Sequence, residues 1–311
     1  MNKITLSFFD PNTKVDFQSL PISRQTITSS CELGNYKYYY NNPNADWQIV
    51  GTWIDNIDAI RGKKIIYLQQ EPPEIRLPAI NILDNCSLIL SFFNIDHTTP
   101  QMIAPPSLQW TYDISAKMVP QKGHVYEKLN NLNVSDYLYS SIPNKTKKCS
   151  IIVSTKIMTE GHKKRLLFVN ELQKKFGDQI DFFGFGFNPI DNKKDAIDPY
   201  HYSIALENSN MNNWFTEKIT DIYLGYTCPI YYGCPNIDSY FDKGSFISID
   251  IDNYSDSFEV IDKAINNPDI INIMNIREAR RSVLLDYNML NLINTAIDRY
   301  DETNHKNKKT H

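Results

Sequence analysis

The sequence predicts an α/β protein of two domains, and three observations support this prediction. A chain of 311 residues exceeds the size of most single domains. Short apolar, β-rich segments alternate with stretches of helical or loop character, as expected for parallel sheets covered by helices. The composition is that of a folded protein, since 41% of the residues are hydrophobic and 12% are aromatic.

The first half of the chain, residues 1–147, is predicted to form one α/β domain. Its apolar segments have strand length and β-rich content, and they lie at residues 4–9, 47–53, 64–69 and 87–93. Residues 54–61, between two of these segments, are helical or loop-like. Helices between strands favour an α/β arrangement over a β-sandwich.

A domain boundary is predicted where the composition turns polar and basic, at residues 142–148, which include a proline. Residues 148–311 then follow a strand, helix, strand, loop, helix, strand pattern, which predicts a parallel, doubly wound sheet. These elements are expected at residues 151–154, 163–176, 180–184, 202–206, 216–226 and 229–232. Later segments are helical, with an apolar pattern over residues 273–297.

Charge and cysteine content exclude several classes of protein. The formal net charge of −4 provides no general attraction for nucleic acid, so we expect no nucleic-acid partner. The basic segment 304–311 allows at most peripheral contact with an anionic membrane. The five cysteines are scattered without a CxxC pair, which favours a reducing compartment and predicts neither a disulfide framework nor a zinc site. With no signal segment or membrane span recognised, we expect a cytoplasmic protein.

The clearest chemical signal lies in residues 200–233. A strand ends there in the polar run Glu207-Asn208-Ser209-Asn210, at the sheet edge where open α/β folds bind ligands. Thr216 is a candidate N-cap for the next helix, whose first turn holds Glu217 and Lys218. A lysine opposes the helix dipole at this end, but together with free N–H groups it suits a pyrophosphate. The alternative is a capped surface helix whose lysine faces solvent.

These residues resemble the donor-binding signature of the α-1,3-fucosyltransferases, glycosyltransferase family 10. The family signature is roughly Tyr-Lys-Phe, Phe-Glu-Asn-Ser, Tyr-Val-Thr-Glu-Lys, then Val-Pro-Val and a glycine. The corresponding pieces stand here in the same order, at residues 200–202, 206–209, 214–218, 228–230 and 233, and weaker matches extend the resemblance over residues 149–250. His201 replaces the usual lysine and Trp214 the usual tyrosine, which leaves the bound base or sugar open.

The resemblance implies the GT-B fold, two Rossmann-like domains facing each other across a cleft. Residues 1–147 would bind the acceptor and residues 148–311 the nucleotide sugar. The implied activity is an inverting, metal-independent transfer of a sugar, with L-fucose from GDP-fucose favoured, and no cofactor. The acceptor would be an oligosaccharide or glycolipid in the synthesis of bacterial lipopolysaccharide or capsule. Two alternatives stay open: another nucleotide-sugar donor, or a non-catalytic protein that binds a glycan or nucleotide.

The resemblance also assigns roles on the donor side. An arginine near the start of the first helix of this domain binds the donor pyrophosphate in the family, and Arg165 is the candidate because its guanidinium can bridge two phosphate oxygens. By the same resemblance, Glu217 would hold donor hydroxyls, Lys218 would contact the phosphates and Asn208 would line the pocket. Further pocket candidates are Glu207, Trp214 and His201.

A candidate catalytic base stands in the first half of the chain. Pro72 holds Glu71 in an extended conformation at the end of a predicted strand. In the family, an acidic residue in a Glu-x-Pro element deprotonates the acceptor hydroxyl, and Glu71 fits this role, with Glu74 as its rival. Trp110 and Tyr112 are candidates either for stacking on acceptor sugars or for the hydrophobic core.

The sequence gives no indication of a metal site. Asp250 and Asp252 have the spacing of a metal-binding DxD motif, but they follow the donor signature, and we interpret them as a pair of loop acids. The histidines show neither HxxxH nor HExxH spacing.

Overall fold

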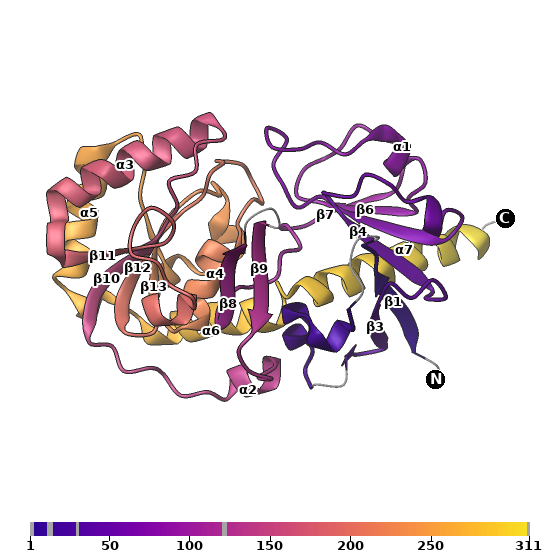
Figure 1. Cartoon of the computed structure of the whole chain (residues 1–311), viewed down its shortest axis with the longest axis horizontal. Coiled ribbons are helices and arrows are strands. Elements are labelled where there is room, and N and C mark those ends of the chain that lie inside the picture. Colours follow the sequence, from indigo (N-terminus) through magenta and orange to yellow (C-terminus); the bar gives the residue numbers. More distant parts are fainter. Residues whose placement is uncertain (1–2, 11–14, 29–30, 120–122, 310–311) are drawn as a thin grey trace. The chain divides into compact units, whose positions relative to one another are not determined.

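The computed structural model describes residues 3–10, 15–28, 31–119 and 123–309 (Figure 1). The chain forms two compact units, and neither is continuous in sequence. The first comprises Met1–Gln109, Asn131–Asp136 and Leu284–His311, and the second comprises Trp110–Asn130 and Tyr137–Val283. The boundary predicted between residues 147 and 148 differs from these limits, because it marks only the start of the strand β10 (Lys147–Ile152). The apolar pattern of the sequence shows where the strands of the second sheet begin, but not that residues 284–311 return to the first unit.

The described residues of the first unit form a seven-stranded sheet in the order β2-β3-β1-β4-β5-β6-β7. Its neighbouring strands are parallel, except that β2 pairs antiparallel with β3. Four strands confirm predicted segments, whereas β2, β3 and β7 were not predicted. The strands are β1 (Ile4–Phe8), β2 (Glu32–Leu33), β3 (Tyr36–Tyr40), β4 (Trp47–Gly51), β5 (Lys64–Leu68), β6 (Leu88–Ser91) and β7 (Gln101–Ile103).

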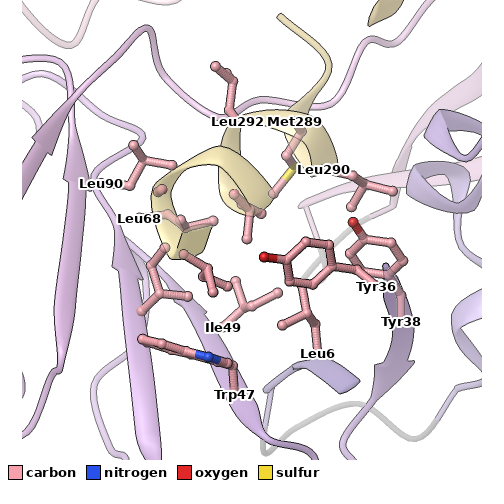
Figure 2. Packing of buried hydrophobic residues seen from close by; sticks show 14 of the residues in the cluster. Leu6, Tyr36, Tyr38, Trp47, Ile49, Leu68, Leu90, Met289, Leu290 and Leu292 are labelled. Carbon is pink, nitrogen blue, oxygen red and sulfur yellow. The ribbon is translucent and has the colours of Figure 1, made fainter. Parts of the chain in front are cut away.

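The core of the first unit joins side chains from both ends of the chain (Figure 2). Leu6 of β1 and Leu290 of α7 (Met289–Lys309) are both fully buried in this cluster. The hydroxyl of Tyr38 donates to Asn294 Oδ1 of the same helix at 2.7 Å. Each buried leucine contributes roughly 1.5–3 kcal/mol. The last helix of the chain therefore belongs to the first unit.

The apolar stretch 273–297, predicted to be helical, contains parts of two helices. It divides into α6 (Ile273–Leu285) and α7. Asn288 is buried at the start of α7, where its Oδ1 accepts the backbone N–H of Leu290 at 2.9 Å. An asparagine that caps a helix in this way sets where that helix starts.

In its described residues, the second unit has a five-stranded parallel sheet in the order β11-β10-β12-β13-β14. This confirms the predicted doubly wound arrangement. The remaining strands of the sheet are β11 (Ile180–Phe183), β12 (Tyr200–Leu206), β13 (Cys228–Tyr232) and β14 (Ile247–Ser248), and its helices are α3 (Glu160–Phe176), α4 (Glu217–Leu224) and α5 (Tyr254–Ile265). An antiparallel pair that was not predicted, β8 (Ile114–Val119) with β9 (Gly123–Lys128), also belongs to this unit.

Shorter elements complete the chain. Two short helices are α1 (Ile80–Leu83) and α2 (Val134–Leu138). Turns of 3₁₀ helix lie at Phe17–Ser19, Pro21–Gln25, Asp58–Ile60, Gly177–Gln179, Lys193–Ala196, Ile237–Ser239, Lys243–Ser245 and Pro268–Ile270. Among the described helices, none combines the length and apolar character that a membrane span requires.

Candidate active site

Glu207 lies at the carboxyl edge of the second sheet, directly after β12. This strand runs parallel to β10 on one side and β13 on the other, so the loops that follow all three strands open on one edge. The backbone N–H of Glu207 continues the pairing by donating to the Tyr232 carbonyl at 2.9 Å. The residue is 1% exposed. The strand therefore carries a carboxyl group into the protein interior at the edge where ligands bind in such folds.

Donors from the start of α4 hold this carboxylate. The backbone N–H of Thr216 donates to Glu207 Oε1 at 2.8 Å, and the Thr216 hydroxyl donates at 2.9 Å. Lys218 Nζ donates to Oε2 at 3.1 Å. Burial raises the pKa of Glu207, and the Lys218 ammonium opposes this shift. Thr216 Oγ1 also accepts the Lys218 N–H at 3.4 Å, which confirms Thr216 as the N-cap of α4.

Gly233 makes room for the buried carboxyl group. It follows β13 and has a φ of +156°. A Cβ atom at this position would lie 2.4 Å from Glu207 Cγ and 2.6 Å from the Tyr231 hydroxyl. The glycine of the sequence signature is therefore required by the close approach of the Glu207 side chain.

Glu217 lies between two ammonium groups. Its Oε1 is 3.8 Å from Lys218 Nζ and 3.7 Å from Lys193 Nζ. Burial alone would raise the pKa of Glu217, but Lys218 and Lys193 hold it at about 2. The side chain keeps 26% of its surface exposed, so an ionised carboxylate remains accessible at the start of α4.

Lys193 and Asp221 complete the cluster, and neither was predicted from the sequence. Lys193 Nζ donates to Asp221 Oδ2 at 2.9 Å, and the buried Asp221 also accepts the backbone N–H groups of Thr111 and Tyr112 at 2.9 and 3.0 Å. Asp221 stands four residues after Glu217 and therefore on the same helix face, a spacing that would have revealed it. Lys193 comes from the turn before β12 and carries no such signal.

Arg165 joins the loops that follow β10 and β12. It lies in α3 and is only 4% exposed. One guanidinium nitrogen donates to Asn208 Oδ1, and another donates to the Ser154 carbonyl at 3.0 Å. Its Nε has no hydrogen-bond partner among the described residues. Arg165 thus positions Asn208, and it keeps one donor for another group.

The first turns of two helices meet at Glu207 and Asn208. A Cβ atom on Gly161, the second residue of α3, would lie 1.7 Å from the Asn208 carbonyl oxygen. The N-cap of α4, Thr216, contacts the Glu207 carboxylate. Helix N-termini carry partial positive charge and free N–H groups, so their convergence suits a bound anion such as a diphosphate.

Two further pocket candidates, His201 and Trp214, lie at different places in the fold. His201 is the second residue of β12, at the amino end of the strand. Glu207 lies six positions further along the chain, about 20 Å along the strand, so the structure sets His201 apart from the cluster. Trp214 lies in the loop before α4, close in sequence to the cap residue Thr216, and its side chain is buried. The signature placed His201 in the pocket, but the length of β12 separates it from the cluster.

Glu71 lies in the first unit, after the carboxyl end of β5. The buried side chain of Gln69 holds this loop, because its Nε2 donates to the Glu71 carbonyl at 2.6 Å and to the Arg76 carbonyl at 2.9 Å. Glu71 is half-buried, whereas Glu74 is exposed. Both candidate bases therefore stand at the carboxyl edge of the first sheet, and the fixed backbone favours Glu71.

The remaining candidates have structural contacts. Trp110 and Tyr112 are buried in the second unit, where each ring contacts Tyr137. They belong to its core, not to an exposed sugar platform. Asp252 pairs with Lys164 at 2.9 Å, and Asp250 accepts the Asp252 backbone N–H, as expected for loop acids. The described residues contain no group of three acidic, histidine or cysteine side chains arranged to hold a metal ion.

Comparison with known proteins identifies the domain that holds this cluster. Residues 142–264 match the family model described as "Glycosyltransferase family 10 (fucosyltransferase) C-term". The segment that holds the cluster is therefore similar to the C-terminal domain of the family 10 glycosyltransferases. The resemblance drawn from the signature residues is thereby confirmed. An alpha-(1,3)-fucosyltransferase, FucT, of Helicobacter pylori is 32% identical over 77 residues, which are 24% of this chain and 16% of that protein. The chain thus aligns with only a small part of this curated relative.

Solved structures show that the fold extends beyond the matched domain. A crystal structure of an alpha1,3-fucosyltransferase with GDP-fucose has a TM-score of 0.52 and 17% identity, covering 90% of this chain and 82% of that chain. A second alpha1,3-fucosyltransferase structure has a TM-score of 0.54 and 17% identity, over 89% and 80% of the two chains. The predicted GT-B fold is confirmed.

Proposed function

We propose that this protein transfers L-fucose from GDP-fucose to a hydroxyl of an oligosaccharide or glycolipid acceptor. One observation carries the proposal: within the family 10 match, Lys218 and Glu217 begin a helix whose N-cap holds the buried Glu207. The cluster offers cations and an ionised carboxylate side by side. A nucleoside-diphosphate sugar requires this pair of functions, because its phosphates are anionic and its sugar carries hydroxyls.

The diphosphate is proposed to bind at Lys218 and the two helix N-termini. Lys218 is paired with Glu207 at 3.1 Å, which fixes its ammonium group at the start of α4. Arg165 contributes positive charge and holds Asn208 in place. Negative charge grows on the diphosphate as it leaves, so fixed cations and N–H groups stabilise the transition state more than the ground state.

Glu217 is proposed to accept hydrogen bonds from hydroxyl groups of the donor. An ionised carboxylate accepts such bonds strongly, and Lys193 and Lys218 keep Glu217 ionised. Its partial exposure leaves an oxygen accessible to the ligand. Glu207, by contrast, is enclosed by Thr216 and Lys218, so we assign it a positioning role.

The reaction is proposed to be a single inverting displacement with Glu71 as the base. The acceptor oxygen forms a bond to the anomeric carbon of the sugar while the bond from that carbon to the diphosphate breaks. The electron pair of the broken bond leaves with GDP, and the acceptor proton passes to the Glu71 carboxylate. Charge stabilisation by Lys218 and Arg165 would make a metal ion unnecessary.

The biological setting is proposed to be the synthesis of bacterial surface polysaccharide, lipopolysaccharide or capsule. The cytoplasmic location and peripheral membrane contact expected from the sequence stay predictions. The same cluster would also serve another nucleotide sugar, because none of its described contacts selects a base or a sugar. A non-catalytic nucleotide-binding protein is the second alternative.

Calorimetric titration without added metal tests the donor, using GDP, GDP-fucose and UDP. The proposal expects tight binding of GDP and GDP-fucose, and transfer of radiolabelled fucose to an oligosaccharide panel. Glu71→Gln should abolish transfer while GDP binding persists, and Glu74→Gln should retain activity. A preference for UDP would indicate a UDP-sugar donor, and the protein would still be proposed to be a glycosyltransferase. Binding of GDP with no transfer by the parent protein would favour the non-catalytic alternative.

A further inference from the structure

Trp53 is an exposed aromatic side chain at the carboxyl edge of the first sheet. The sequence contains four tryptophans, all of them in described segments. Trp53 is 57% exposed, whereas Trp47, Trp110 and Trp214 are 1%, 4% and 4% exposed. A single exposed aromatic residue needs no explanation by itself, but its neighbours here relate it to the candidate base.

Hydrogen bonds tie the loop of Trp53 to the loop of Glu71. β4 and β5 are neighbouring parallel strands in which Gly51 pairs with Leu68. Just beyond this pair, Thr52 Oγ1 accepts the backbone N–H of Gln70 at 2.6 Å and donates to the Leu68 carbonyl at 3.0 Å. Trp53 directly follows Thr52, and Glu71 directly follows Gln70. The two residues therefore leave the same sheet edge from neighbouring strands, which lie about 4.8 Å apart in a sheet.

A second connection runs through Arg76. Its guanidinium lies 5.0 Å from the centre of the Trp53 ring. The Arg76 carbonyl and the Glu71 carbonyl accept from the same Gln69 amide, at 2.9 and 2.6 Å. Gln69 therefore fixes the backbone of the candidate base and the backbone of the residue that contacts Trp53.

The chemistry around Trp53 suits a neutral sugar ring. A pyranose has an apolar C–H face that can pack on an aromatic ring, and a rim of hydroxyls that needs donors and acceptors. Arg76 pairs with Asp55, whose carboxylate side chain is 81% exposed. The opposite charges of this pair cancel, so it offers hydrogen bonds to hydroxyl groups without favouring an anionic ligand.

We propose that Trp53, Arg76 and Asp55 form an acceptor subsite for a neutral pyranose, next to the sugar whose hydroxyl is deprotonated by Glu71. The inference rests on the proposed function. It adds a specificity determinant: acceptors of two or more sugars bind better than a monosaccharide, because the second ring stacks on Trp53.

Quenching of tryptophan fluorescence by acrylamide tests this subsite in the intact protein. The quencher reaches mainly Trp53, because the other three indoles are buried. Lactose, N-acetyllactosamine and chitobiose are the probes, and the parent protein should show reduced quenching with at least one of them. No protection by any probe would overturn the subsite. Calorimetry with GDP on the same sample tests the proposed function separately, because nucleotide binding does not depend on Trp53.

Transfer kinetics provide the second measurement. Trp53→Ala should raise the acceptor KM about tenfold, a loss of about 1.4 kcal/mol, and leave the KM of GDP-fucose unchanged. Trp53→Phe retains a ring and should recover most of the affinity. An unchanged acceptor KM in Trp53→Ala, or an equal rise with a monosaccharide acceptor, would refute the inference. A parent protein that binds no GDP would instead refute the proposed function.

Discussion

The carboxyl edges of the two sheets have opposite characters. At the edge of the second sheet, the buried carboxylates of Glu207 and Asp221 are each paired with a lysine, Lys218 and Lys193. At the edge of the first sheet, Gln69 and Thr52 form the fixed framework, and both are neutral. The charged groups of the first edge stand on the loops beyond this framework.

The difference follows from what it costs to bury a charge. Removing a carboxylate from water costs several kcal/mol unless partners surround it, so a buried charge such as Glu207 enforces one arrangement of its neighbours. Burying a neutral amide such as that of Gln69 costs less free energy, and its hydrogen bonds fix only the backbone of the Glu71 loop. This contrast agrees with the proposed function, in which the second edge binds a diphosphate of constant structure and the first edge binds hydroxylated acceptors that vary.

Removing the central cation should have the largest effect. Lys218→Met leaves Glu207 buried without its ammonium partner, so we expect a loss of about 3–5 kcal/mol in the free energy of unfolding. GDP affinity should fall about 100-fold or more, because the phosphates lose the same cation. Urea denaturation and calorimetry measure the two effects. Lys163→Met is the control, since Lys163 lies on the exposed surface of α3 and pairs with Glu160. Equal effects in both variants would contradict the role of Lys218.

Removing Lys193 should have a smaller effect on the same edge. Asp221 keeps its bonds from Thr111 and Tyr112 in Lys193→Met, so the fold should survive. Glu217 loses one of its two cations, and its pKa should rise from about 2 towards its ordinary value. We expect GDP-fucose to bind about tenfold more weakly at neutral pH, through disturbed placement of Glu217.

The pH dependence of GDP-fucose binding shows whether the weaker binding by Lys193→Met is caused by the changed pKa of Glu217. A carboxyl group with a lowered pKa keeps its favourable charge above its ordinary range and loses it as the pH falls through the folded-state pKa. Binding by Lys193→Met should therefore weaken at a higher pH than binding by the parent protein. Calorimetry with GDP-fucose across the acidic range measures this. Profiles that coincide would show that Lys193 does not act through Glu217, and Lys174→Met, on the exposed face of α3, is the control.

Removing the Gln69 amide at the first edge should slow catalysis without changing the affinity for the donor. Gln69→Leu removes the bonds to the Glu71 and Arg76 carbonyls, so the base loses its fixed position. We expect kcat to fall about five- to tenfold with GDP affinity unchanged, since each bond contributes about 0.5–1.5 kcal/mol. Gln101→Leu is a matched control, because Gln101 clamps the Ile95 and His97 carbonyls of another loop in the same unit. A fall in GDP affinity would contradict the separation of the two edges.

The contrast also explains what could be predicted from the sequence. Thr216 has a local cause, since it caps the helix that follows it, and Gly233 is required by the close approach of the Glu207 side chain; the signature contains all three residues. Lys193 comes from a turn without periodic pattern, and only the fold brings its ammonium to Glu217. The burial of Trp110, the exposure of Trp53 and the return of α7 to the first unit depend on packing between distant segments, which local sequence does not encode.

The smallest predicted effect concerns a lysine of the second unit that bonds to neutral oxygens instead of a carboxylate. Lys145 Nζ donates to the Gly225 carbonyl and to Thr227 Oγ1, both at 2.7 Å. Burial lowers the pKa of Lys145 to about 7, although Asp198 opposes the shift. The pKa values of Lys193 and Lys218, by contrast, are raised by the carboxylates around them.

A lysine whose pKa is lowered in the folded state binds fewer protons there than in the unfolded chain, between about pH 7 and its ordinary value of 10.5. The Lys145 contribution to stability should therefore increase as the pH rises through this window. In Lys145→Met that part of the increase is absent, so the stability difference between the two proteins should change by about 1 kcal/mol or less between pH 7 and about pH 8. Urea denaturation at both pH values measures it. Lys147→Met is the control, because Lys147 is exposed and Asp181 raises its pKa. A pH-independent difference for Lys145→Met would show that Lys145 stays charged in the fold, and the contrast between neutral and charged surroundings would then not extend to this residue.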